Sequence, residues 1–236
     1  MFKHFALTSL LLVSLNAFGA ELTVLVDGQP RPEYQGRGAT YVEAIRGQSY
    51  ELRITNPTPY RVGVALSVDG LNTIDARHTD SWNAAKWVLE PYESAVISGW
   101  QVNDQTARRF FFTGERDSYG AALGQTNNLG VIEAVFYGER HREITVYAPR
   151  SKAQAPSAEG RAAAPPSDDY AATGMGERTE HDVERVNIDL ERQPFASVRI
   201  RYEFRPQLIK LGVFTQSPLQ RRERARGFEG YCPEPR

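Results

Sequence analysis

Apolar and polar residues alternate strictly between positions 61 and 68 of the chain. The apolar positions are Val62, Val64, Leu66 and Val68. Successive side chains of a strand point to opposite faces of a sheet, so this spacing predicts a strand with one buried face. Asp69-Gly70 follows at once and predicts a turn, because glycine accepts the positive φ that tight turns need.

Short apolar runs bounded by turn residues recur from residue 21 to residue 150. Besides 61–68, strands are expected at 22–26, 41–45, 49–55, 86–89, 94–100, 107–113, 130–137 and 143–147. The turn at 90–93 is expected to join the strand at 86–89 to the strand at 94–100. Many short strands without a long amphipathic helix are typical of an all-β protein. We therefore predict an antiparallel β-sandwich, or a flattened barrel, over residues 20–149.

Residues 150–180 differ in composition from the predicted sandwich. They are rich in alanine, proline and glycine and contain almost no large apolar side chains. Such a segment cannot bury enough surface to order itself, so we interpret it as a disordered, flexible linker.

Strand patterns return after the predicted linker. Residues 183–190 and 197–205 flank a turn at Gln193-Pro194-Phe195, and the second run alternates cleanly. We interpret residues 181–214 as a C-terminal β-hairpin. Two strands alone are marginally stable in water, so the hairpin is expected to dock on the sandwich and complete it. Docking within one chain gives a single unit, whereas exchange between chains gives a homo-oligomer or swapped dimer.

The N-terminus has the ordered features of a secretory signal peptide, which we assign to residues 1–19. Lys3 and His4 precede an apolar run at 5–15, and Ala17-Phe18-Gly19 fits a cleavage site before Ala20. The apolar run is shorter than the roughly 20 residues of a membrane span. We therefore expect a periplasmic or secreted protein without an integral membrane span.

Composition limits the partners and the stabilising chemistry. The 236 residues have a formal net charge of −1, which gives no global field to recruit nucleic acid. Cys232 is the only cysteine, so packing and not an internal disulfide must stabilise the fold. Its thiol is expected to be exposed, with pairing to another chain as the alternative. Residues 215–236 form a polar, basic tail, expected to be solvated, with contact to anionic lipid or polysaccharide as the alternative.

Oxygen-bearing side chains are concentrated after the strand at 61–68. Asp69, Asn72 and Asp75 are spaced by three residues, and oxygen ligands in one loop are what calcium requires. The spacing is not that of an EF-hand, and Asp and Asn also stabilise ordinary turns. We therefore predict no metal or other cofactor, with a calcium-stabilised surface or matrix protein as an alternative.

His78, Asp80 and Ser81 contain the groups of a hydrolase triad. Triad members normally converge from separate elements, and no G-x-S-x-G surrounds Ser81. We therefore predict no catalytic residue. The alternative is a hydrolase of a cell-envelope or extracellular polymer, with carboxylates that converge from the long polar loops 71–85 and 114–129.

Aromatic side chains near the long loops are candidates for partner binding. Trp87 and Trp100 are expected to pack in the core because they lie in predicted strands. Trp82 lies in a loop, where a large side chain with a polar edge suits sugar or protein binding. The predicted binding residues are Trp82, His78, Tyr119 and Arg116.

Six segments together resemble a recurrent set in secreted bacterial proteins of unknown function. These segments are ALSVDGLNTID, ISGW, RRFFFT, GVIEAVFY, ATGMGE and RYEFRPQLIKLGV, within a resemblance that covers most of residues 40–214. The resemblance implies a β-rich exported protein in which the hairpin and the sandwich form one inherited unit. It implies no activity and supplies no catalytic residues. We therefore expect an exported, non-enzymatic binding or assembly module for a protein or glycan partner in the cell envelope.

Overall fold

The structure, a computed structural model, describes residues 19–140 and 169–214. Several expectations lie outside these residues: nearly all of the signal peptide, the strand at 143–147, residues 150–168 of the predicted linker, Cys232 and the basic tail. No helix within the described ranges combines the length and the apolar character that a bilayer crossing demands.

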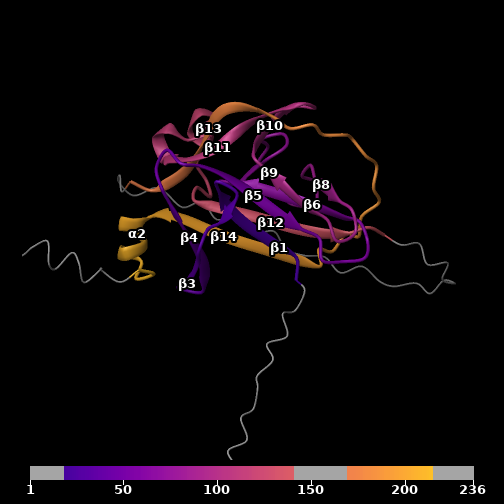
Figure 1. Ribbon diagram of the computed structural model, residues 1–236, viewed down its shortest axis with the longest axis horizontal. Coiled ribbons are helices and arrows are strands. Elements are labelled where there is room, and N and C mark those ends of the chain that lie inside the picture. The colour runs from indigo at the N-terminus through magenta and orange to yellow at the C-terminus, as the bar shows by residue number, and fades with distance from the viewer. Residues whose placement is uncertain (1–18, 141–168, 215–236) are drawn as a thin grey trace, which may run out of the picture.

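Two β-sheets pack face to face, which confirms the all-β sandwich (Figure 1). The first sheet runs in the order β10 (Gly99–Asn103), β11 (Thr106–Gly114), β5 (Ser49–Thr55), β1 (Glu21–Val26) and β2 (Gln29–Pro30), while β13 (Ala171–Glu180) pairs with β11 and β9 (Ser94–Ile97) with β5. The second sheet runs in the order β3 (Glu33–Gly36), β4 (Ala39–Ala44), β14 (Ala196–Phe204), β12 (Val131–Gly138), β6 (Val62–Val68) and β7 (Leu71–Asn72), while β8 (Trp87–Leu89) pairs with β6. The helices are short: η1 (Glu115–Asp117), α1 (Tyr119–Ala122) and α2 (Arg205–Lys210).

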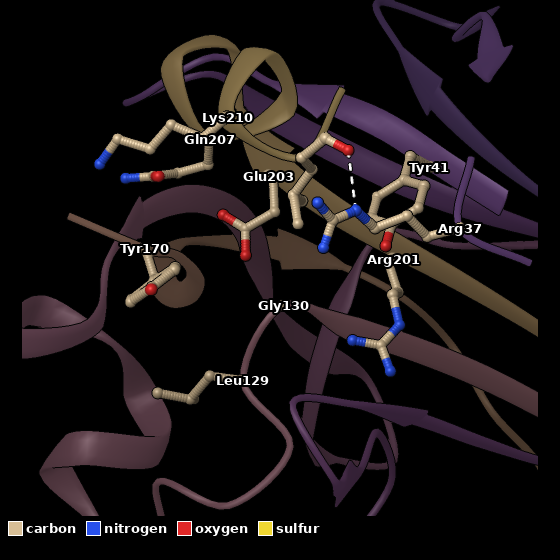
Figure 2. A pocket seen from close by; sticks show the side chains of 10 residues that line it. Arg37, Tyr41, Leu129, Gly130, Tyr170, Arg201, Glu203, Gln207 and Lys210 are labelled. Atoms are coloured by element: carbon tan, nitrogen blue, oxygen red, sulfur yellow. Dashed lines mark hydrogen bonds between the residues drawn. The ribbon is translucent and has the colours of Figure 1, made fainter. Parts of the chain in front are cut away.

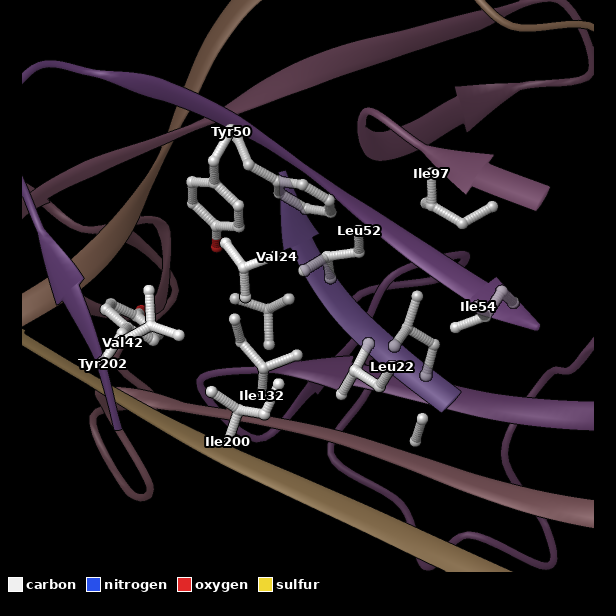
Figure 3. Packing of buried hydrophobic residues seen from close by; sticks show 14 of the residues in the cluster. Leu22, Val24, Val42, Tyr50, Leu52, Ile54, Ile97, Ile132, Ile200 and Tyr202 are labelled. Carbon is white, nitrogen blue, oxygen red and sulfur yellow. The ribbon is translucent and has the colours of Figure 1, made fainter. Parts of the chain in front are cut away.

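The alternation at 61–68 produces a strand, as predicted: β6, an inner strand of the second sheet. Its apolar side chains are fully buried, and the cluster that they join contains residues of both sheets. Figure 3 shows Leu22, Val24, Leu52 and Ile54 of the first sheet with Ile132 and Ile200 of the second. Burial of each large side chain contributes about 1.5–3 kcal/mol, so this interior stabilises the fold.

A smaller hydrophobic cluster covers the outer face of the second sheet. It consists of Ala65, Ala84, Val135, Tyr137 and Leu190, with Trp82 and Ile188 partly buried against it. Gly63 lies beneath this cover, and a Cβ atom there would lie only 2.6 Å from Cδ1 of Leu190. The small residues between the valines of β6 therefore let a loop and the 188–190 segment pack closely on this face.

The prediction that the linker extends to residue 180 is wrong for its last ten residues, which form β13. This strand pairs with β11 along its whole length, from Gly114 opposite Ala171 to Thr106 opposite Glu180. Its small residues pack where larger ones would not fit, since a Cβ at Gly174 would lie 2.2 Å from the Phe111 ring. A composition rich in small residues predicts a segment that is not buried. In β13, however, the small side chains allow the strand to pack closely on β11.

The C-terminal segment completes the second sheet, but its two predicted strands do not pair as a hairpin. β14 is inserted between β12, its antiparallel neighbour, and β4, its parallel neighbour. Residues 182–189 form no strand, and the preceding strand β13 belongs to the first sheet. The chain therefore crosses from one sheet to the other between β13 and β14.

Candidate binding groove between the sheet edges

The crossing between the sheets is made by residues 181–189, here called the connecting segment. Figure 1 shows it as an orange loop that curves around the end of the molecule opposite α2. Its start is held by His181 N, which donates to Gln105 O at 3.0 Å, and by Val183 N, which donates to Asp104 O at 2.8 Å. Its end is held by Arg140 N, which donates to Asp189 O at 2.7 Å. The backbone of residues 184–188 makes no hydrogen bond to any described residue.

A groove of about 820 Å³ runs between the connecting segment and the strands beside it. Its walls include Trp87 and Val88 of β8, Ala95 and Ile97 of β9, and Gln101 and Val102 of β10. Val102 and Val186 are about half exposed, at 55% and 49%. The groove therefore combines an apolar wall with an accessible rim, and its volume lies in the range of ligand sites in other proteins.

The groove exists because β8 and β9 do not pair with each other. β8 pairs only with β6 of the second sheet, and β9 pairs only with β5 of the first. The turn between them, in which Tyr92 has a φ of 60°, carries the chain from one sheet to the other instead of closing a hairpin. Each strand is therefore left with one edge that has no ladder partner within the described ranges, and both strands line the groove.

Trp87 and His181 form a fixed aromatic wall in the groove. Their ring centroids are 5.5 Å apart with an interplanar angle of 63°. The indole Nε1 of Trp87 donates to Thr73 Oγ1 at 2.9 Å, and Nδ1 of His181 lies 2.7 Å from Oε1 of Gln101. Burial lowers the pKa of His181, against a weaker opposing effect of Asp182. The imidazole is therefore neutral at pH 7 and serves as a packing and hydrogen-bonding surface.

The charges that line the groove are mostly negative. Its acidic side chains are Asp75, Glu90, Asp104, Asp182 and Glu184, and its basic side chains are Lys86 and Arg185. Five acidic against two basic groups give a net charge of −3. Burial lowers the pKa of Lys86, whose Nζ donates to Ala84 O at 2.9 Å and points toward Trp82 O. The groove therefore presents an anionic surface beside its apolar wall.

The four predicted binding residues lie in separate surroundings. Trp82 packs on Tyr137 in the outer cluster of the second sheet, with ring centroids 5.5 Å apart. Tyr119 packs on Trp100, with centroids 5.0 Å apart, and Arg116 is exposed in η1. His78 is exposed, and its Nδ1 lies 2.8 Å from Gly70 O. The structure does not bring the four together.

The three candidate triad residues have other partners. Oγ of Ser81 lies 2.7 Å from the hydroxyl of Tyr137. Asp80 accepts hydrogen bonds from the backbone of Trp82 and from the backbone and side chain of Asn83. His78 bonds to Gly70, as described above. These contacts fix a loop and do not form a nucleophile–base–acid chain.

The loops 71–85 and 114–129 meet, as the hydrolase alternative requires, but the surface between them offers no carboxylate pair. A shallow depression there is lined by Ala76, Arg77, His78, Thr79, Gly124, Gln125 and Asn127. This lining has no Asp or Glu, so a general acid and a general base for glycoside hydrolysis are not placed at this depression.

Asp69 is buried inside the sandwich and accepts three hydrogen bonds. The donors are Gly130 N at 2.8 Å, Thr173 N at 2.7 Å and the Tyr202 hydroxyl at 2.5 Å. Oγ1 of Thr173 also lies 2.6 Å from the Tyr202 hydroxyl and 2.7 Å from the Tyr50 hydroxyl. We call these five residues the buried network. Burial raises the pKa of Asp69 to about 6, although the three donors partly oppose this effect.

The remaining members of the calcium alternative also bond to the protein itself. Oδ1 of Asn72 accepts from Ile74 N at 2.8 Å, and its Nδ2 donates to Ala85 O at 2.8 Å. Oδ1 of Asp75 accepts from Arg77 N at 3.1 Å. Across residues 19–140 and 169–214, no three His, Cys, Asp or Glu residues are grouped as a metal site.

Sequence reasoning missed the groove and its principal residues. Trp87 is expected from the sequence to lie in the core, whereas it packs against the core only in part and lines the groove with His181. The sequence contains one indication of the groove. Residues 181–189 are mostly polar and charged, which is unusual for a strand that packs over the edge of a sheet. No protein-family model, curated protein or solved structure matches this chain. The chemistry of the groove is therefore the main indication of what this protein does.

Proposed function

We propose that this protein is an exported, non-enzymatic binding module that holds an extended, basic segment of a partner polypeptide in the groove. The observation that carries the proposal is the position of β8 and β9, which belong to different sheets, each have one edge without a ladder partner among the described residues, and both contribute residues to the same groove. An extended segment can add to such an edge through backbone hydrogen bonds, while its alternate side chains enter the apolar wall.

The chemistry of the lining favours a partner with alternating apolar and basic residues. The apolar side chains of Trp87 and Val102, which are not fully buried, can cover one face of an added strand. The net charge of −3 attracts lysine or arginine on the other face and increases the association rate at low salt. Five or six residues of added strand would span about 17–20 Å.

The connecting segment supports the same proposal. Unpaired strand edges promote aggregation, and proteins commonly cover them or place charges beside them. Here the cover carries Asp182, Glu184 and Arg185 and is fastened by hydrogen bonds only at its two ends. Such a cover can move aside for a partner without the loss of a backbone ladder.

Binding is tested with two synthetic decapeptides of alternating residues, one of valine and lysine and one of valine and glutamate. Fluorescence anisotropy at low and high salt gives their affinities for the full chain. The valine–lysine peptide is expected to bind, and its affinity is expected to fall as salt screens the groove charges. Binding of neither peptide, or equal binding of both, contradicts the proposal.

Two matched substitutions locate the binding surface. Val102→Arg places a cation and extra bulk on the groove rim and is expected to weaken peptide binding about tenfold. Val96→Arg adds the same side chain to an exposed position of β9 that is absent from the groove lining, and it is expected to leave binding unchanged. Equal effects of both substitutions place the peptide elsewhere. A glycan array provides the alternative test. If the wild type binds a glycan on the array and Val102→Arg does not, the partner is a glycan and not a polypeptide.

Export is the part of the proposal that depends on the N-terminal pattern at residues 1–19. The intact mass of the protein purified from its native host is expected to lack about 19 residues, as signal-peptide removal requires. A mass that begins at Met1, from a cytosolic fraction, contradicts export and leaves the groove proposal to its own test.

A further inference from the structure

A second cavity, of about 400 Å³, lies beside α2 at the end of the sandwich away from the connecting segment (Figure 2). Its lining contains three basic side chains, Arg37, Arg201 and Lys210, but only one acidic side chain, Glu203. These four side chains together carry a net charge of +2 when Glu203 is ionised and of +3 when it is protonated. This sign is opposite to that of the groove.

The basic groups reach the cavity from three separate elements. Arg37 lies in the turn between β3 and β4 with a φ of 49°, and its Nε donates to Leu211 O at 2.8 Å. This bond fixes the guanidinium, and Figure 2 shows its terminal nitrogens on the side that faces Glu203. Arg201 comes from β14 and Lys210 from α2. Convergence from distant parts of the sequence gives a site that is built by the fold.

Glu203 lies at the inner side of the cavity without an ion-pair partner. Its Oε2 accepts from Ala171 N at 3.2 Å, and no described Arg or Lys approaches it within 4.0 Å. Arg37 and Arg201 likewise form no ion pair within the described ranges. Arg37 and Arg201 thus line the cavity without a neutralising carboxylate in contact among the residues that the structure describes.

Gly130 keeps the cavity open beside Glu203. Its φ is +72°, and a Cβ there would lie 3.1 Å from Tyr202 O and 3.5 Å from Oε1 of Glu203. Any larger residue would be strained and would narrow this side of the cavity. The backbone N–H of Gly130 donates to Asp69, so the cavity lies directly against the buried network.

We propose that this cavity binds a small, multiply charged anion through its carboxylate or phosphate groups, with Arg37 and Arg201 as the principal contacts and Lys210 as a further cation. Guanidinium groups match the planar or branched oxygens of such anions, and charged hydrogen bonds are stronger than neutral ones. The volume is sufficient for a small metabolite. Glu203 acts against binding while it is ionised. This site is independent of the groove and of its proposed peptide partner.

The test is a calorimetric titration of the full chain with citrate and, separately, with inorganic phosphate, against sodium chloride at equal ionic strength. At least one of the two anions is expected to bind, and the pair distinguishes a carboxylate ligand from a phosphate ligand. Arg201→Gln is expected to weaken binding about tenfold, because it removes a charged hydrogen-bond donor. Binding of neither anion at millimolar concentration overturns the proposal.

Two further variants make the test specific. Arg199→Gln is the matched control for Arg201→Gln, because both arginines are exposed on the same face of β14 and Arg199 does not line the cavity. It is expected to leave the affinity unchanged. Glu203→Gln keeps the shape and removes the opposing charge, so it is expected to tighten binding about threefold or more. Equal losses in the two arginine variants, or weaker binding in Glu203→Gln, overturn the proposal.

Discussion

The two ends of β13 approach the second sheet in opposite ways. Near its first residue, Thr173 joins the buried network and connects to Asp69 and Tyr202 of the second sheet. Beyond its last residue, the connecting segment crosses to the same sheet, and residues 184–188 make no backbone hydrogen bond to described residues. The sandwich is therefore fastened internally at one end, and the partner proposed above would enter at the other.

Polar chemistry is also distributed differently between these ends. The donors and acceptors of the buried network are paired with one another. Opening the network would therefore leave several buried polar groups without a hydrogen-bond partner. The charged side chains of the connecting segment are exposed to water. Movement of this segment therefore leaves no buried charge without a partner. The buried network and the groove proposed to bind a peptide thus lie at different ends of one small sandwich, and the following predictions test this separation.

Hydrogen exchange should give the largest contrast. Thr173 N donates to the buried carboxylate of Asp69, whereas the amides of residues 184–188 have no partner among the described residues. We expect exchange at Thr173 to be at least about a thousandfold slower than at 184–188, because a buried amide exchanges mainly through large-scale unfolding. Mass spectrometry with peptide-level resolution measures the ratio. Comparable protection in both segments would remove the distinction between a fastened end and a free end.

Asp69→Ala should be the most damaging single substitution at the fastened end. It leaves Gly130 N, Thr173 N and the Tyr202 hydroxyl without their acceptor, and each unsatisfied buried group costs about 1–3 kcal/mol. We expect the free energy of unfolding in urea to fall by about 3 kcal/mol or more. The control is Asp182→Ala in the connecting segment, for which we expect a change of at most about 0.5 kcal/mol. Similar losses from the two substitutions would contradict the comparison.

The fastened end should also dominate the pH dependence of stability. Burial raises the pKa of Asp69 from 3.8 to about 6, so the folded state holds this proton more tightly than the unfolded state. Its contribution to the free energy of unfolding is therefore greatest below about pH 4 and is lost as pH rises to about 6, by up to roughly 3 kcal/mol. Burial raises the pKa of Glu203 to about 7, which extends the fall in the same direction.

The measurement is a set of urea unfolding curves between pH 4 and pH 7 for the wild type and for Asp69→Asn. The difference between the two free energies reports the titration of Asp69 together with its weak coupling to Glu203, because carboxylates that do not interact with Asp69 contribute equally to both proteins. We expect the wild type to lose stability relative to the variant as pH rises. A difference that is constant across this range would show that Asp69 does not titrate there.

The smallest effect is expected at the free end. Arg185 and Asp104 form an ion pair at 3.6 Å, and their side chains are 91% and 66% exposed. Exposed pairs of this kind contribute little, so Arg185→Gln should change the free energy of unfolding by less than about 0.5 kcal/mol. A thermal or urea melt measures this change. A loss above 1 kcal/mol would mean that the connecting segment is a structural fastening after all.

Alternation predicted the parts of the fold in which one face is buried. β14 follows the pattern of its apolar residues, since a shift by one residue would expose those residues to water. β6 follows it because its outer face, beneath Leu190, has room only for small residues such as Gly63. The pattern failed for β13, where the small residues Ala172 and Gly174 are buried opposite the larger residues Thr113 and Phe111. Periodicity also cannot choose strand partners. It therefore suggested a hairpin for β14, which pairs with strands distant in sequence.

The candidate sites were less predictable than the fold because they depend on how distant segments meet. Trp87 lines the groove only because the turn at 90–93 crosses between sheets, and the sequence of that turn is equally suited to a hairpin. Arg37 and Lys210 are 173 positions apart and share a cavity only after β14 is inserted beside β4. Asp69 was recognised as a special residue, but its burial could not be inferred from local spacing.

The insertion of β14 at the centre of the second sheet has a consequence for the order of events during synthesis. β14 pairs in parallel with β4, and Ile200 lies opposite Thr40, so two halves of the sheet remain separate until this last strand emerges. Contacts between residues so distant in sequence form slowly. The nascent chain is thus expected to stay incompletely folded until nearly all of it has been translated. For a chain exported as proposed, this delay would preserve an unfolded, translocation-competent state and would leave final folding to the destination compartment.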